Sequence, residues 1–277
     1  MGASNSAPWG SCFRLVASEK WKSKSAVLGN AVTESLVEYA RPLPGMQILD
    51  LASGTGEPGI SLAQRVSPSG AVTAIDQSSE LLEIAAERAR AKKLSNFTTR
   101  QADAHALPFA ERSFDLATCR FGVMFFMNAQ GALSEVRRVS NPEARACFVA
   151  WGPIEQPYWE TTVKIVHRHV GGDLLPPGGA DPFRFSAAGS LSAVLSAAGF
   201  HEIEESVQNL PWTWPGDAPE VFEYACAVAA PFRAMLDRVP EEEWPSIRAE
   251  AVAAIERHRV GDEIRFGANV ILASGRA

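Results

Sequence analysis

The chain has 277 residues, of which 46% are hydrophobic and 21% are charged, so it is long enough to bury a core and is not compositionally disordered. Its formal net charge of −6, without a block of lysine and arginine, argues against binding to a nucleic-acid backbone. The four cysteines are scattered without a C-x-x-C pair, which indicates neither a metal site nor a disulfide framework and makes a reducing cytoplasm the expected location. No apolar run reaches roughly 18 residues, so no membrane span is expected.

Residues 1–45 form the first predicted segment, which is helical over 9–40 and ends at the sequence RPLPG. From 46 to 151, short apolar runs alternate with amphipathic stretches. The apolar runs predict strands at 46–51, 71–75, 97–100, 114–119 and 145–151. The amphipathic stretches predict helices at 57–66, 79–93 and 129–139. Strands separated by helices of this length imply a mostly parallel sheet with right-handed crossovers.

The alternation breaks down after residue 151. Residues 152–186 are expected to form an irregular insert that caps the core. Residues 187–277 are expected to complete the core with a helix at 187–198 and strands at 201–210 and 264–273. A mainly helical insert at about 217–259 separates these two strands. Two inserts of this size usually cover the active face of an α/β core.

The sequence ILDLASGTGEPGI at 48–60 combines a strand with glycines at the spacing G-x-G-x-x-G. Glycines let a ligand approach the backbone closely, and nicotinamide-dependent enzymes use the same spacing. In those enzymes a pyrophosphate sits at the N-terminus of the next helix. Asp50 at the strand end and Glu57 in the first helical turn would repel that anion and favour a cationic ligand. An NAD-dependent oxidoreductase is therefore the less favoured alternative.

Two further acids follow the second and third predicted strands. Asp76 could accept hydrogen bonds from both hydroxyls of a ribose. Asp103 could accept from an adenine amino group while the backbone N–H of Ala104 donates to a ring nitrogen. Each acid also has a purely structural alternative, in which Asp50 caps its loop, Asp76 caps a helix and Asp103 is a surface turn residue.

Four stretches together resemble the successive motifs of class I S-adenosylmethionine-dependent methyltransferases, namely ILDLASGTGEPG, AVTAIDQSSELLEIA, RQADAHALPFAERSFDLATC and ALSEVRRV. The nearest subgroup is the ubiquinone/menaquinone-biosynthesis-like one, and the resemblance covers about 47–151 plus LSAAGF ending at Phe200. It implies an α/β, Rossmann-like class I methyltransferase fold with a mostly parallel seven-stranded sheet, helices on both faces and a helical cap. Residues 46–151 would then be the S-adenosylmethionine-binding core.

The sequence departs from the family pattern at two places. Ala52 stands where the first glycine of the loop is usual, and it is expected to fit if its φ is negative. The stretch NPEAR at 141–145 replaces a proline-glycine-glycine turn before the fifth strand, where only a local change is expected.

The resemblance assigns roles within the cofactor site. It implies that the methionine end of S-adenosylmethionine, or of the product S-adenosylhomocysteine, is held by Asp50 and by the loop of Ala52, Ser53, Gly54 and Gly56. It further implies that Asp76 binds the ribose and that Arg120 closes over the site through its backbone. The adenine would be contacted by Gln77, Asp103 and Ala104.

A sulfonium methyl group is already activated, so transfer needs a nucleophile held in line at roughly 3 Å, without a metal or a covalent intermediate. The sequence names no base. His167 and His169 on a predicted helix, and the side chain of Arg120, are weak candidates for catalytic roles, and a packed or solvated role is the alternative for the histidines.

The predicted function is methyl transfer to a small molecule. Aromatic residues in the inserts favour a flat, aromatic or polyketide-like acceptor if they line a pocket, although they could equally pack the inserts onto the core. The alternative is a protein that binds S-adenosylmethionine without methyl transfer, such as a cofactor-assisted cyclase or a sensor. A monomer and a homodimer are both open.

Overall fold

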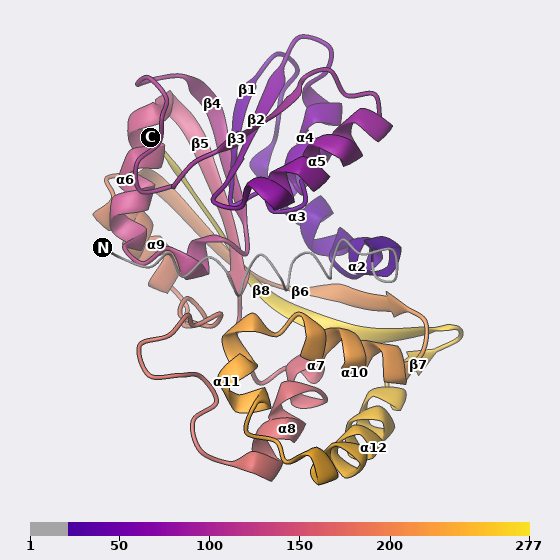
Figure 1. Cartoon of the computed structure of the whole chain (residues 1–277). Helices are drawn as coiled ribbons and strands as arrows, with labels where there is room; N and C mark the ends of the chain where they lie inside the picture. The colour runs from indigo at the N-terminus through magenta and orange to yellow at the C-terminus, as the bar shows by residue number, and fades with distance from the viewer. Residues whose placement is uncertain (1–21) are drawn as a thin grey trace. The chain divides into compact units, whose positions relative to one another are not determined.

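The computed structural model describes residues 22–277 (Figure 1). The start of the predicted N-terminal helical segment and Cys12 lie outside these residues. The chain divides into two compact units. We call residues 32–152, 184–208 and 270–277 the core unit, and residues 22–31, 153–183 and 209–269 the helical unit.

One sheet runs in the order β3-β2-β1-β4-β5-β8-β6, and β7 pairs only with β8. The strands are β1 (Gln47–Leu51), β2 (Ala71–Asp76), β3 (Phe97–Gln101), β4 (Phe114–Arg120), β5 (Ser140–Trp151), β6 (His201–Pro215), β7 (Arg259–Val260) and β8 (Glu263–Arg276). The pairs from β3 to β5 are parallel, whereas β5 and β8 are antiparallel. The predicted Rossmann-like α/β fold is confirmed, with the two-residue β7 as an addition to the seven expected strands.

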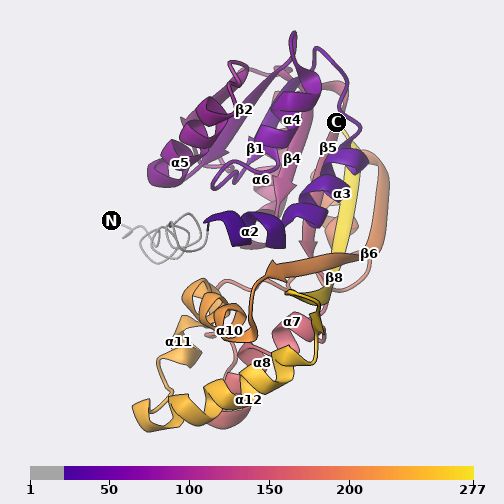
Figure 2. The same cartoon turned by 90° about the vertical axis from the view of Figure 1, so that its right-hand side faces the viewer.

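Helices cover both faces of the sheet in the core unit. Figures 1 and 2 show α4 (Gly59–Val66) and α5 (Ser79–Ala91) on one face, and α6 (Ala129–Val139) and α9 (Ser190–Ala197) on the other. The short helix η1 (Val123–Phe125) follows β4, and α3 (Asn30–Ala40) precedes β1. The core is apolar because β1 contributes Ile48, Leu49 and Leu51, all 0% exposed.

The helical unit contains α2 (Lys22–Leu28), α7 (Pro157–Glu160), α8 (Val163–Val170), α10 (Ala218–Ala227), η2 (Ala230–Phe232), α11 (Arg233–Leu236), η3 (Glu241–Glu243) and α12 (Trp244–Glu256). Its aromatic side chains contact one another. Tyr158 meets Trp159, Trp212 and Phe266 edge to face, with ring centroids 4.8, 6.0 and 5.6 Å away. These contacts favour a packing role for the buried aromatic residues of the inserts. The domain bounds expected from the sequence stay a prediction.

Two elements begin elsewhere than predicted. The helix expected from residue 57 begins at Gly59, after a loop that has positive φ angles at Ala52, Gly54 and Gly56. The strand expected from residue 145 begins at Ser140, and the stretch 141–145 forms an irregularity between the pairs Phe114–Ser140 and Leu116–Arg145.

Asp115 connects the starts of β1, β4 and β5, since it accepts hydrogen bonds from Gln47 N and Asn141 Nδ2 at 2.8 and 2.7 Å. Asp115 thus has a structural role at the start of β4.

None of the helices within residues 22–277 has both the length and the apolar character that a bilayer crossing requires.

The apolar β1 strand gives a first prediction. Replacing Leu49 with alanine is expected to lower the free energy of unfolding by about 2–5 kcal/mol, because it leaves a cavity between the sheet and its helices. Leu43→Ala is the matched control: Leu43 is 60% exposed, so a change within about 0.5 kcal/mol is expected. Urea unfolding followed by circular dichroism measures both, and equal losses would contradict the assignment of β1 to the core.

Candidate active site

The predicted cofactor residues lie in loops that follow parallel strands. Because β1, β2, β3 and β4 are mutually parallel, their carboxyl ends share one edge of the sheet. Ligands of open α/β sheets bind beyond this edge. The structure therefore brings the loops after β1, β2 and β3 together with the end of β4.

Asp50 is fully buried, and both oxygens of its carboxylate accept hydrogen bonds from the protein. Its Oδ2 accepts hydrogen bonds from Ser53 Oγ at 2.6 Å and Gly59 N at 3.1 Å, and its Oδ1 accepts from Thr118 Oγ1 at 2.7 Å. Thr118 is the register partner of Asp50 on β4. The carboxylate thus joins β1, the glycine loop, α4 and β4.

Burial raises the pKa of Asp50 to about 6, while the hydrogen bonds and the nearby charge of Arg120 act in the opposite direction. At pH 7 the group is mainly ionised, so a negative charge lies directly behind the loop. The guanidinium of Arg120 donates to Thr33 Oγ1 of α3 at 2.7 Å. Arg120 therefore links the end of β4 to α3.

The glycine loop has a left-handed backbone at three positions. Ala52, Gly54 and Gly56 have φ angles of 48°, 54° and 107°. The negative φ under which alanine is expected to fit at position 52 is not found, and the alanine adopts the conformation that a glycine would take more easily. The methyl group of Ala52 fits because the neighbouring Gly122 has no side chain. A Cβ atom at position 122 would collide with the Cβ atom of Ala52. A Cβ at Gly54, by contrast, would have no atom within 4 Å, so this part of the loop faces open space.

Asp76 connects the loops after β1 and β2. Its Oδ2 accepts from Gly54 N and its Oδ1 from Ser78 N, both at 2.9 Å. Burial raises the pKa of Asp76 despite these backbone donors. Asp76 therefore holds the open part of the glycine loop against the end of β2.

Gln77 and Asp103 continue this connection to the loop after β3. The backbone carbonyl oxygen of Gln77 accepts a hydrogen bond from Gln101 Nε2 at 2.8 Å. Asp103 Oδ1 accepts from the backbone N–H and Nδ1 of His105, at 2.9 and 2.7 Å. Although partial burial acts to raise the pKa of Asp103, the hydrogen bonds from His105 lower it on balance. Ala104, between them, is buried.

The candidates for catalysis are placed in different units. His167 and His169 lie on a helix, as the sequence predicted; this helix is α8 of the helical unit. His167 Nε2 is 2.8 Å from the carbonyl oxygen of Gly172, and His169 Nε2 is 2.8 Å from Glu250 Oε2. Arg120 lies in the core unit with the cofactor residues. Among residues 22–277, no group of three His, Cys, Asp or Glu side chains could hold a metal ion.

An aromatic pair stands where β4 and β5 end. Phe121 stacks on Trp151 with the ring centroids 4.4 Å apart and the planes 14° apart. Phe121 has a φ of 59°, which is unusual for a bulky residue and typical of positions constrained by function. Trp151 is buried, so the pair packs two aromatic rings at the carboxyl edge of the sheet.

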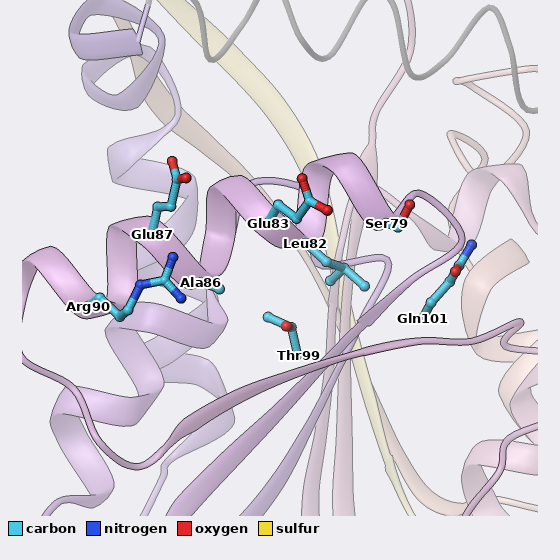
Figure 3. Close-up of a pocket in the computed structure, with 8 residues that line it drawn as sticks. All are labelled: Ser79, Leu82, Glu83, Ala86, Glu87, Arg90, Thr99 and Gln101. Carbon is cyan, nitrogen blue, oxygen red and sulfur yellow. The ribbon is translucent and has the colours of Figure 1, made fainter.

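A hollow of about 340 Å³ lies along α5 and the edge strand β3. Figure 3 shows its lining side chains, which are Ser79, Leu82, Glu83, Ala86, Glu87, Arg90, Thr99 and Gln101. It contains none of the residues predicted to hold the cofactor.

Sequence reasoning missed Thr118, Phe121 and His105 as parts of this region. A hydroxyl residue within the buried apolar strand FDLATCR was the available signal for Thr118, since a buried polar group needs a partner. The positive φ of Phe121 and the contacts of His105 with a distant loop leave no such signal.

The chain matches known proteins over most of the core unit. Residues 42–156 match the sequence family described as "Methyltransferase domain". Over 179 residues the chain is 30% identical to the ubiquinone/menaquinone biosynthesis C-methyltransferase UbiE of Xanthomonas oryzae pv. oryzae, which covers 59% of this chain and 69% of that protein.

The chain is also 34% identical over 122 residues to the demethylmenaquinone methyltransferase of Lactobacillus johnsonii. This match covers 42% of this chain and 50% of that protein. Among solved structures, the YcgJ protein from Bacillus subtilis aligns with a TM-score of 0.57 and 22% identity, over 88% of this chain and 97% of that one. At this identity the structural likeness shows the fold alone.

The contact between Thr118 and Asp50 gives the second prediction. Thr118→Val removes the hydroxyl donor at nearly constant volume. We expect the pKa of Asp50 to rise above its value of about 6, and the free energy of unfolding at pH 7 to fall by about 1–3 kcal/mol, because a buried oxygen loses its donor. Carboxyl-carbon NMR titration and urea unfolding measure these changes. Thr118→Ser, which keeps the hydroxyl, is the control, and an unshifted titration in the valine variant would refute the role of Thr118.

Proposed function

The chain belongs to the class I S-adenosylmethionine-dependent methyltransferases of the ubiquinone/menaquinone-biosynthesis kind, and we propose that it methylates a planar, apolar small molecule. The observation that carries the proposal is the buried carboxylate of Asp50 directly behind an open glycine loop. A mainly ionised acid at this place favours a ligand with positive charge, such as an ammonium or sulfonium group.

The described residues fit S-adenosylmethionine. The open space at Gly54 leaves room for a ligand against the backbone of residues 53–56, where we place the methionine end. Since both oxygens of Asp50 accept hydrogen bonds from the protein, Asp50 would act by shaping this loop and through its charge. When bound, the cofactor supplies an activated methyl group.

The remaining contacts follow from the two other acids. Asp76 would accept hydrogen bonds from the ribose hydroxyls while it keeps Gly54 in place. Asp103 has one oxygen bonded to His105, which leaves its other oxygen for the adenine amino group. The N–H of Ala104 and the side chain of Gln77 would complete the adenine site. Arg120 would contribute its backbone, since its guanidinium is engaged with Thr33.

The acceptor we propose is an aromatic ring related to a reduced quinone, methylated at carbon. Two observations support this choice. The stacked pair of Phe121 and Trp151 places two aromatic rings beside the end of β4, where we place the acceptor. The matched relatives from Xanthomonas oryzae and Lactobacillus johnsonii carry names of quinone-pathway methyltransferases. Catalysis would come mainly from holding the ring carbon in line with the methyl group.

We further propose a cytoplasmic location. We also propose that the protein has no nucleic-acid partner, in line with its net charge of −6.

The test is a labelling assay. Purified protein is incubated with methyl-labelled S-adenosylmethionine and a panel of short-chain demethylmenaquinols, simple phenols and aliphatic amines, and labelled products are separated by chromatography. We expect label in the quinols at carbon. Tight cofactor binding without any labelled product would favour the non-transferring alternative, and binding of NAD in its place would favour an oxidoreductase.

Asp76 provides the matching variant test. Asp76→Asn is expected to weaken S-adenosylhomocysteine binding by about 10–100-fold, because charge-assisted hydrogen bonds contribute roughly 1.5–3 kcal/mol. Asp115→Asn is the control: Asp115 also accepts two hydrogen bonds, but at the opposite end of the strands. Calorimetric titration measures both variants. Equal affinities in the wild type and in Asp76→Asn would rule out a ribose role for Asp76.

A further inference from the structure

We propose that His105 is a positioning residue whose imidazole locks the loop after β3 to the loop after β4, and so fixes the acceptor side of the site relative to the cofactor. The inference rests on the proposed function. His105 belongs to the sequence DAHALPF, and nothing in its local sequence context points to a distant partner.

The two ring nitrogens of His105 face different loops. Nδ1 is 2.7 Å from Asp103 Oδ1, and Nε2 accepts the backbone N–H of Asn128 at 3.3 Å. Only the neutral imidazole with its proton on Nδ1 satisfies both contacts, because Nε2 must keep its lone pair to accept. The ring of Phe126 meets the imidazole edge on, with centroids 5.9 Å apart and planes at 70°, and sets the orientation of the ring.

This link completes a chain of hydrogen bonds around the carboxyl edge of the sheet. The loop after β1 is bonded to the end of β2 through Gly54 and Asp76. The loop after β2 is bonded to the end of β3, because Gln101 Nε2 donates to the carbonyl oxygen of Gln77, and Ala102 N donates to the carbonyl oxygen of Asp76. His105 then carries the connection to the segment that follows η1. Further along, the same loop is bonded to α6, where Leu107 N donates to Glu135 and the guanidinium of Arg138 donates to the carbonyl oxygen of Leu107. The imidazole is the link that reaches residue 128, ahead of that helix.

The segment 126–128 has few other attachments. The carbonyl oxygen of Phe126 accepts from Arg184 Nη1 at 2.8 Å, and the side chain of Asn128 caps α6. Phe126 is buried, with 8% of its surface exposed, whereas Met127 is 87% exposed, so apolar burial holds the start of the segment but not the residue next to Asn128. A hydrogen bond from a half-buried ring therefore matters more for the position of this segment than for overall stability. The His105 side chain is 27% exposed.

Position is the quantity on which methyl transfer depends. A displacement of about 1 Å at the reacting atoms can cost on the order of 100-fold in rate. Loss of the link is thus expected to lower turnover while cofactor binding and folding change little.

The test separates the two hydrogen bonds of the imidazole. His105→Ala removes both, whereas His105→Gln places an acceptor near the position of Nε2 that can still accept the N–H of Asn128. With saturating S-adenosylmethionine, we expect His105→Ala to lower turnover by about 10–100-fold. Its S-adenosylhomocysteine affinity should stay within about threefold, and its Tm close to the wild type, because exposed hydrogen bonds contribute little. His105→Gln is expected to recover part of the lost turnover.

Hydrogen exchange gives a readout that does not need activity. The amide of Asn128 should exchange faster in His105→Ala and regain protection in His105→Gln. Turnover losses of His105→Ala and Asp103→Ala should also be less than additive in the double variant, as expected for residues that act as one link. Unchanged exchange at Asn128, or fully additive losses, would overturn the role of His105. A wild type that protects Asn128 but transfers no methyl group would instead count against the proposed function.

Discussion

The buried charge of Asp50 is the constraint from which the rest of the site follows. A carboxylate with no exposed surface is costly to desolvate unless donors surround it. The donors come from Ser53 in the loop, Gly59 at the start of α4 and Thr118 on β4. Each donor fixes the element that carries it. The glycine loop is therefore held from behind by one side chain, which leaves its outer face available for a ligand.

Much of the fold could be predicted from the sequence, because strands and helices alternate with clear apolar periods and the motifs follow in family order. The acids at the strand ends were also found, since parallel strands bring their carboxyl ends to one edge. What could not be predicted depends on residues distant in the chain. The φ angle of Ala52 depends on Gly122, and the contact of Thr118 with Asp50 depends on the register between β1 and β4. His105 gave no local sign of its contact with Asn128.

The aromatic residues divide into two groups that composition alone cannot separate. Tyr158, Trp212 and Phe266 satisfy one another inside the helical unit, as residues of a small core do. Phe121 and Trp151 instead stack at the end of two sheet strands, and one of them has a strained backbone. Strain of this kind persists only where the surroundings enforce it, which is why we assign the acceptor surface to this pair.

The fit between Ala52 and Gly122 also restricts the order in which this sequence can change over evolution. As long as residue 52 is alanine, any side chain at position 122 would collide with the Ala52 methyl group and with the sulfur of Cys119. A lineage that returned to glycine at position 52 would relieve the first obstacle, and only a smaller residue at position 119 would relieve the second. Three sites, on one strand and two loops, are thus expected to change together, and homologues with a larger residue at 122 should carry both accompanying changes.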